Sequence, residues 1–370
     1  MVERDLNQVR RVVVKVGTNL ISDSDGIDLS RIDMIVRQIA ILQKRGINVL
    51  LVTSGAVGLG ARELGLRQKV QTVVMRQTCA SIGQPILMSH YRAAFAAYHV
   101  VCSQVLITKR ELNDRKTFVN LKNSVTSLLE HNVVPIFNEN DTVSTDEVGS
   151  AVGDNDRLGA FVASKIDADL LILLTDIDGL YSQDPRIDSD AHLIHEVSQV
   201  DEQLLKSAGS SGSQFSTGGM RTKLLAARIA SHAGCATVIA SGFVDTVLTD
   251  IIEGRRVGTY FSPDKRLNQR IRWILNSATK GTIWIDDGAI RALKNHKSLL
   301  PSGIVGVEGA FEAGEVVMVN RIAKAVPYYN SSEIMESMGH QSSDVGDSVK
   351  KGRPDVIFRP EDLVFLDYAD

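Results

Sequence analysis

Short apolar runs alternate with longer helical segments between Val12 and Ala240. Val12–Val16 is apolar on both faces of a strand except at Lys15, and Gly17 follows it. Such runs are typical of strands in a parallel sheet, because helices cover both faces of that sheet. The other runs of this kind are Ile47–Val52, Val100–Ile107, Val133–Phe137, Leu170–Leu174 and Ala236–Ala240. Alternation without hairpin signals predicts an α/β fold, a three-layer sandwich around a mainly parallel sheet.

The segments between these runs have helical spacing. In Leu29–Lys44 apolar residues recur every three or four positions, and Gly46 ends the pattern. Helices are also expected at Cys79–Ala97, Phe118–His131 and Leu158–Ile166. Sheets of this class bind ligands beyond the carboxyl ends of their strands. The residues that follow each strand are therefore the first candidates for a functional site.

The pattern changes after Tyr260. A basic connector, Ser262–Arg272, precedes short β-like runs separated by turn residues. These runs are Thr282–Ile285, Ile304–Val307, Val316–Val319 and Ala323–Tyr329. They predict a small β-rich second domain, which a chain of 370 residues can accommodate. We expect a first domain at 1–260, a linker at 261–279 and the second domain at 280–366.

The three cysteines favour a reducing, cytoplasmic setting. Cys79, Cys102 and Cys235 lie far apart and include no CxxC pair, so neither a disulfide framework nor a zinc site is predicted. Near the N-terminus the apolar run is only Val12–Val16, which is too short for a signal peptide or a membrane span. No metal site formed by the protein alone is predicted.

The stretch Ser216–Lys223, with the sequence STGGMRTK, precedes a predicted helix. Gly218 and Gly219 fall at its first turn, where backbone N–H groups can bind an anion that approaches closely. Thr217 can cap the helix, and Lys223 adds a positive charge. The stretch favours a binding site for nucleotide phosphates. A flexible loop capped into a helix is the alternative.

Polar residues also gather where successive strands end. They are Lys15, Ser54–Ala56, Asn138–Asp141, Gly153–Asp156 and Thr175–Asp176. Lysines and carboxylates at one sheet edge suit phosphoryl transfer, which needs positive charge on the transferred group. Ordinary turn chemistry accounts for any one cluster, but less readily for five. The sequence contains neither the GxxxxGK[ST] motif of P-loop proteins nor the HRD and DFG motifs of protein kinases.

Several motifs occur together and in order. They are VKVGTN at Val14–Asn19, VTSGAVGLG at Val52–Gly60, NEND at Asn138–Asp141, GDND at Gly153–Asp156, TDIDGLYSQDPR at Thr175–Arg186 and STGGMRTK at Ser216–Lys223. As a set they resemble the glutamate 5-kinase branch of the amino acid kinase family. This resemblance covers about the first 260 residues. The tail from Lys280 to Leu366 resembles a PUA domain.

The resemblance implies an activity and its partners. The expected reaction is ATP-dependent phosphorylation of the γ-carboxylate of L-glutamate, the first step of proline synthesis. ATP and Mg²⁺ are the implied cosubstrate and cofactor, and proline is the implied inhibitor. The resemblance also implies a homo-oligomer, either a dimer or a tetramer, and an association with glutamyl phosphate reductase.

The resemblance also assigns residue roles. Lys15 and Lys223 are expected to neutralise the transferred phosphoryl group, and Asp156 to organise them. Glutamate is expected to contact Ser54, Gly55, Ala56, Asp141 and Asn155, with the Gly55–Ala56 backbone facing the γ-carboxylate. The nucleotide is expected to contact Lys15, Thr175, Asp176, Thr217, Gly218, Gly219, Met220, Arg221, Thr222 and Lys223. The loop Asp146–Val152 is longer than the resemblance implies, which leaves the geometry between Asp141 and Asn155 open.

Two alternatives remain. An acetylglutamate or aspartate kinase would share the phosphate-binding residues and differ in the amino-acid site. An RNA-binding protein would act through the PUA-like tail. From Lys280 onward the chain has ten Lys and Arg against fourteen Asp and Glu. An acidic tail is a poor binder of a phosphate backbone, so RNA binding is not expected as the main role.

Overall fold

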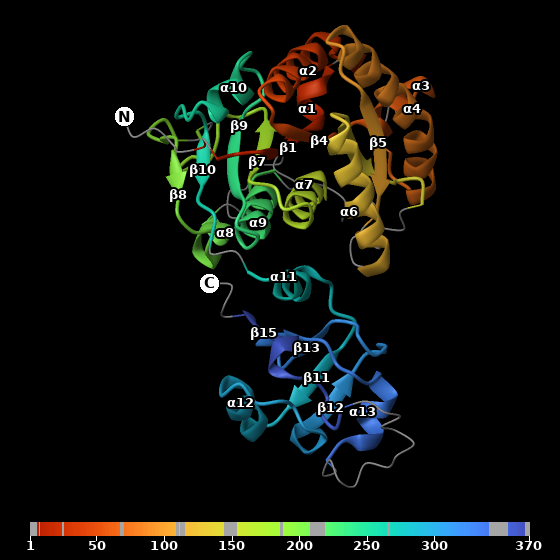
Figure 1. The fold of residues 1–370 in the computed structure, drawn as a ribbon, viewed down its shortest axis with the longest axis vertical. Coiled ribbons are helices and arrows are strands. Elements are labelled where there is room, and N and C mark those ends of the chain that lie inside the picture. Colours follow the sequence, from red (N-terminus) through yellow and green to blue (C-terminus); the bar gives the residue numbers. More distant parts are fainter. Residues whose placement is uncertain are drawn as a thin grey trace. The chain divides into compact units, whose positions relative to one another are not determined.

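A computed structural model describes residue 6 and residues 8–23, 26–66, 70–108, 111, 115–143, 154–185, 188–207, 219–264, 267–339 and 354–366. The chain divides into two compact units, Met1–Arg266 and Leu267–Asp370 (Figure 1). The loop Asp146–Val152 and residues Thr217 and Gly218, which the sequence analysis singled out, lie outside the described residues.

Eight strands form the main sheet of the first unit, in the order β5-β6-β4-β1-β7-β9-β10-β8. They are β1 (Arg11–Val16), β4 (Asn48–Val52), β5 (Cys102–Ile107), β6 (Val134–Glu139), β7 (Leu170–Thr175), β8 (Glu196–Val197), β9 (Ala236–Ser241) and β10 (Thr259–Phe261). The central strand β1 pairs in parallel with β4 and β7, whereas β10 runs antiparallel to β9. The predicted mainly parallel sheet is confirmed, and the short strands β8 and β10 extend it.

Helices cover both faces of this sheet (Figure 1). On one face lie α2 (Leu29–Lys44), α4 (Val73–Ala97) and α10 (Val247–Ile252), and their side chains form one core with the sheet. On the other face lie α6 (Arg115–Glu130), α7 (Asp154–Lys165), α8 (Glu202–Ser207) and α9 (Gly219–Ser231), with a second core. The remaining short elements are α1 (Thr18–Ile21), β2 (Ser22–Asp23), β3 (Gly26–Ile27) and α3 (Ala56–Glu63). Among the described helices, none is long and apolar enough to span a membrane.

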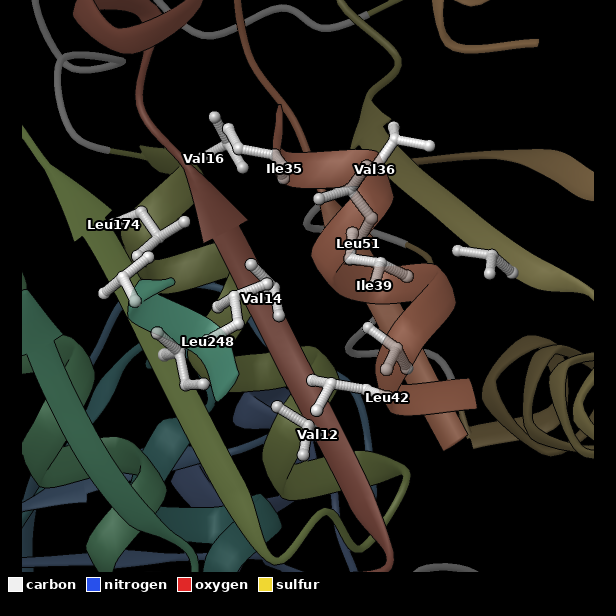
Figure 2. Packing of buried hydrophobic residues seen from close by; sticks show 14 of the residues in the cluster. Val12, Val14, Val16, Ile35, Val36, Ile39, Leu42, Leu51, Leu174 and Leu248 are labelled. Atoms are coloured by element: carbon white, nitrogen blue, oxygen red, sulfur yellow. The ribbon is translucent and has the colours of Figure 1, made fainter. Parts of the chain in front are cut away.

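The alternation of side chains along β1 determines which face receives Lys15. Val12, Val14 and Val16 are fully buried in the core beneath α2, where Figure 2 shows them beside Ile35, Ile39 and other residues of that helix. Each such burial contributes about 1.5–3 kcal/mol. Because successive side chains of a strand point to opposite faces, Val13 and Lys15 face α7 and α9. The apolar pattern thereby fixes the position of a cationic side chain.

Helix α4 begins at Val73, six residues before the predicted start at Cys79. Thr72 caps it, because the Thr72 Oγ1 accepts a hydrogen bond from the backbone N–H of Met75 at 3.2 Å. The cap adds a first turn that carries Arg76, a residue with no partner evident from local sequence.

Helices α3 and α4 touch backbone to backbone at two glycines. A Cβ at Gly83 of α4 would lie 1.8 Å from the carbonyl oxygen of Ala56, and one at Gly60 of α3 would lie 1.8 Å from that of Cys79. Neither distance is sterically allowed, so only glycine permits this approach. The contact fixes α4 directly against the first residue of α3.

The second unit has a five-stranded sheet in the order β12-β11-β13-β14-β15. Its strands are β11 (Thr282–Ile285), β12 (Ile304–Glu308), β13 (Val317–Val319), β14 (Ala323–Ala325) and β15 (Leu363–Phe365), and its helices are α11 (Gln269–Asn276), α12 (Asp287–Lys294) and α13 (Ser331–Ser337), with 3-10 turns at Pro301–Gly303 and Pro360–Asp362. Within the range 261–279 that the sequence analysis treats as a linker, α11 buries Ile274 against Val316 and Val364 of this unit.

Candidate active site

Two lysines meet one buried carboxylate at the carboxyl edge of the main sheet. Lys15 Nζ lies 2.6 Å from Oδ1 of Asp156, and Lys223 Nζ lies 3.2 Å from Oδ2. Asp156 is 1% exposed, and both lysines are buried. The three sequence-predicted catalytic residues therefore form one cluster, although they come from β1, α7 and α9.

Local packing brings these elements together. A Cβ at Gly159 of α7 would lie 3.4 Å from the Cβ of Lys15, so the helix runs close to the strand. Helices α7 and α9 share the same core on this face. At the start of α9, Thr222 Oγ1 donates to Oδ2 of Asp156 at 3.1 Å, and Lys223 Nζ donates to the carbonyl of Gly219 at 3.3 Å. Lys223 thus links Asp156 to the first turn of α9.

Burial and charge shift the pKa values of this cluster. Burial raises the pKa of Asp156, but Lys15 and Lys223 lower it further than burial raises it, so the pKa lies below its usual range. Burial lowers the pKa of Lys15; Asp156 opposes this shift, and Lys223 adds to it. Two cationic side chains thus share one ionised carboxylate, and together they can offer N–H donors to a bound anion.

A second cluster surrounds Asn155, the residue before Asp156. Asn155 Nδ2 lies within hydrogen-bonding distance of the carbonyl of Thr53 (2.6 Å), Oγ of Ser54 (2.8 Å) and Oδ1 of Asn138 (3.1 Å). Asn138 Nδ2 in turn donates to Oε1 of Gln84 at 2.8 Å. These contacts join the ends of β4 and β6 to α7 and α4.

The turn between β4 and α3 presents backbone donors beside this cluster. Gly55 has φ +102°, a left-handed conformation that favours glycine, and it precedes Ala56, the first residue of α3. The N-cap residue, Gly55, has no side chain that could cap this helix. The first N–H groups of a helix have no partner within the helix, so those of α3 can bind a carboxylate.

The predicted substrate residue Asp141 lies in a third cluster, with Arg76 of α4. Arg76 Nε and Nη2 donate to Oδ1 of Asp141 at 3.0 and 2.7 Å, and Nη2 lies 3.9 Å from Oε2 of Glu139. Among the residues that the structure describes, no direct hydrogen bond joins Asp141 to Asn155. Asp141 and Asn138 nevertheless lie three residues apart at the end of β6.

The predicted nucleotide residues Thr175 and Asp176 lie at the end of β7. Asn19 Nδ2 donates to Oδ2 of Asp176 at 3.2 Å, and Thr175 Oγ1 donates to Oδ1 at 3.0 Å. Partial burial raises the pKa of Asp176, but these two hydrogen bonds contribute to a net lowering. Asp176 thus presents an ionised carboxylate beyond the strand next to Lys15.

The remaining predictions lie on α9 or outside the described residues. Gly219, Met220, Arg221, Thr222 and Lys223 form the first turns of α9; Arg221 is exposed, whereas Met220 packs against the core of this face. Thr217 and Gly218 precede the described part of this segment. Sequence reasoning missed Arg76 and Gln84, which lie on α4 rather than at a strand end. The cap residue Thr72 is the signal that could have indicated the first turn carrying Arg76.

Comparison with known proteins gives matches over both units. The sequence profile of the amino acid kinase family matches residues 10–241, and that of the PUA domain matches residues 281–348. A protein named glutamate 5-kinase from Thermoanaerobacter sp. strain X514 is 41% identical over 97% of this chain and 99% of its own length. One of the same name from Carboxydothermus hydrogenoformans is 41% identical over 98% and 99%, and one from Methanosarcina acetivorans is 38% identical over 99% and 98%.

Proposed function

The chain belongs to the glutamate 5-kinase branch of the amino acid kinase family, and from this premise we propose that it phosphorylates the γ-carboxylate of L-glutamate with ATP. The product is L-glutamyl 5-phosphate, and the reaction is the first step of proline biosynthesis. The observation that carries the proposal is the pair of lysines on one buried carboxylate, Lys15 and Lys223 on Asp156.

In this reaction the two lysines act on the phosphoryl group that moves. Each ammonium group has three N–H donors, and Asp156 fixes the directions of both side chains before the nucleotide arrives. Phosphoryl transfer depends on positioning and on neutralising charge over the transferred group and its leaving oxygen. Lys15 comes from β1 and Lys223 from α9, and both are assigned to neutralising that group. Asp156 holds the two ammonium groups close to its oxygens and so orients both.

The amino acid binds at the neighbouring clusters. We assign the γ-carboxylate to the backbone N–H groups at Gly55 and Ala56, with Ser54 and Asn155 beside them. We assign the α-ammonium to Asp141. The nucleotide is assigned to Thr175 and Asp176 at the end of β7, and to the segment Thr217–Lys223, whose described part begins α9.

Magnesium is proposed as a partner of the ATP phosphates. Both oxygens of Asp156 already face lysine ammonium groups, at 2.6 and 3.2 Å, so this carboxylate does not suit a metal ion. A magnesium ion would therefore be held by the nucleotide rather than by Asp156, and it would supply further neutralisation of phosphate charge.

The same proposal includes the regulation and setting typical of the family. These are inhibition by proline, a homo-oligomer of two or four chains, cooperation with glutamyl phosphate reductase, and a cytoplasmic location. An acyl phosphate hydrolyses readily, which gives the association with a reductase a chemical reason.

The direct test is an assay for the acyl phosphate. Purified protein with ATP and Mg²⁺ is expected to yield a hydroxamate in the presence of hydroxylamine and L-glutamate. N-acetylglutamate and L-aspartate serve as the comparison substrates. Greater kcat/KM with either of these would replace the proposal by the corresponding sister kinase.

Asp141→Asn is expected to raise the KM for L-glutamate by roughly 30-fold while leaving the KM for ATP nearly unchanged. The neutral amide keeps the shape of the side chain but removes the charge that pairs with the α-ammonium. Steady-state kinetics with each substrate varied in turn gives both constants. Asp250→Asn, which alters a carboxylate paired with Arg255 on α10, is the matched control. An unchanged glutamate KM in Asp141→Asn would refute the ammonium assignment.

A chain that ends at Arg266 is expected to fold and to phosphorylate glutamate. It retains every strand of the main sheet and all of the assigned side chains. Circular dichroism and the hydroxamate assay, run beside the full chain, give the comparison. A soluble shortened protein that binds ATP without turnover would show that the second unit contributes to the active site.

A further inference from the structure

We propose that Arg76 binds the α-carboxylate of the amino-acid substrate, so that Asp141 and Arg76 together recognise both charges on the α-carbon. This inference rests on the proposed glutamate kinase activity and assigns a specificity residue within it. Arg76 was not among the residues that the sequence motifs identified.

The geometry of the ion pair supports this role. Arg76 Nε and Nη2 both donate to the same oxygen of Asp141, Oδ1, at 3.0 and 2.7 Å. A fork-to-fork arginine–carboxylate pair would use both carboxylate oxygens. Within the described part of the chain, no hydrogen bond reaches Oδ2 of Asp141. That oxygen is therefore available to an incoming ammonium group.

The guanidinium likewise retains donors for a second carboxylate. It has five N–H donors, and Asp141 engages two of them. The Arg76 side chain is 22% exposed, whereas that of Asp141 is 9% exposed. The pair is thus buried enough for its charges to act strongly, yet the arginine still reaches solvent, from which a substrate enters.

The two carboxylates near Arg76 explain why a positively charged side chain is needed in an amino-acid site at this position. Glu139 Oε2 lies 3.9 Å from Arg76 Nη2, so two carboxylates adjoin one guanidinium. These two carboxylates attract an ammonium group, but they repel the α-carboxylate that accompanies it in an amino acid. Arg76 is placed between them and offsets that repulsion. With this positive charge, the site can bind the α-carboxylate of an amino acid together with its α-ammonium group.

The spacing of the clusters matches a substrate charged at both ends. Asp141 lies three residues after Asn138, and Asn138 contacts Asn155 at 3.1 Å beside Ser54. Three extended residues span roughly 10 Å at most. The Asn155 cluster and the Arg76–Asp141 pair thus both adjoin the end of β6, and we assign the γ-carboxylate to the first and the α-carbon to the second.

The test combines a protein change with a substrate change. In L-isoglutamine a neutral carboxamide replaces the α-carboxylate, while the α-ammonium and γ-carboxylate remain. Wild type, Arg76→Gln, Arg76→Lys and the control Arg45→Gln are compared for kcat/KM with L-glutamate and with L-isoglutamine, and for thermal stability. Arg45, the C-cap residue of α2, forms an exposed ion pair with Glu253 at 3.0 Å, and it precedes β4 whereas the assigned Ser54 follows the other end of that strand.

The expected result is a loss that depends on the α-carboxylate. Arg76→Gln should lower kcat/KM for glutamate by roughly 30-fold through KM, with little change for isoglutamine. Arg76→Lys should restore part of the glutamate activity, and Arg45→Gln should match the wild type. Equal losses on the two substrates, or no loss on glutamate, would overturn the proposal and leave Arg76 as a residue that only holds the loop after β6.

Two controls keep the outcome interpretable. If Arg76→Gln does not fold, Arg76→Lys carries the test, because it retains the charge but not the fork: a loss confined to glutamate supports the proposal, and any other pattern overturns it. If the wild type makes no hydroxamate from glutamate, the proposed function itself fails, and this is seen before any variant is measured.

Discussion

Lys15→Ala and Lys223→Ala are each expected to lower kcat by ~100-fold or more, because each removes a preorganised positive charge from the transferred phosphoryl group. The KM for glutamate should change much less, since the amino acid binds at Asp141 and the Asn155 cluster. The free energy of unfolding should fall only a little, because each change leaves Asp156 with one lysine partner.

The control for these variants is Lys122→Ala. Lys122 pairs with Asp167 at 2.9 Å and is one third exposed, so this change removes a lysine and an ion pair away from the assigned site. Initial rates at saturating ATP and glutamate, with thermal melting of each variant, separate chemistry from folding. A kcat near that of the wild type in Lys15→Ala or Lys223→Ala would remove that lysine from the proposed mechanism.

Asp156→Asn is expected to abolish measurable turnover and to lower the free energy of unfolding by about 3–5 kcal/mol. Two buried ammonium groups would lose their shared counter-charge, and an unpaired buried charge is costly. Without Asp156, burial would lower the pKa of Lys15 still further. A lysine whose pKa is lower in the folded state than in the unfolded state reduces the free energy of unfolding, fully at pH values below the folded-state pKa. The loss of stability in Asp156→Asn should therefore become smaller as the pH rises from the folded-state pKa of Lys15 toward its unfolded-state pKa.

Chemical denaturation of Asp156→Asn at several pH values measures this effect. The double variant Lys15→Met/Asp156→Asn is the matched control, since it removes one of the two uncompensated charges. It should regain much of the lost stability and none of the activity. A single variant as stable as the wild type would mean that the three side chains are not a coupled charge cluster.

Much of the fold and part of the site follow from the sequence, because both depend on local patterns. Strands that are buried on both faces, such as β1 and β7, have continuous apolar runs, whereas a helix that is buried on one face has apolar residues only every three or four positions. The same runs place Lys15 and Thr175 at strand ends, where ligands bind in such sheets. The predicted Lys15, Asp156 and Lys223 do meet in the structure, although sequence alone gives no distance between them.

The rest depends on tertiary contacts that local patterns do not encode. Strands β8 and β10 are two and three residues long and exist through pairing with their neighbours. Arg76 acquires its partner only when α4 packs beside the end of β6, 65 residues further along the chain. Gln84 is likewise identified by its contact with Asn138 and not by any motif.

The contact between Gly60 and Gly83 has a consequence for how sequence variation in this protein would be read. Neither glycine is among the residues assigned to the substrate, yet each allows α3 and α4 to approach backbone to backbone, at Cys79 and at Ala56. In a library of variants selected for growth without added proline, we expect both positions to retain only glycine, as strictly as position 15 retains lysine. A survey of such a library would rank them as active-site positions, although their contribution is to keep the scaffold of the amino-acid site in register.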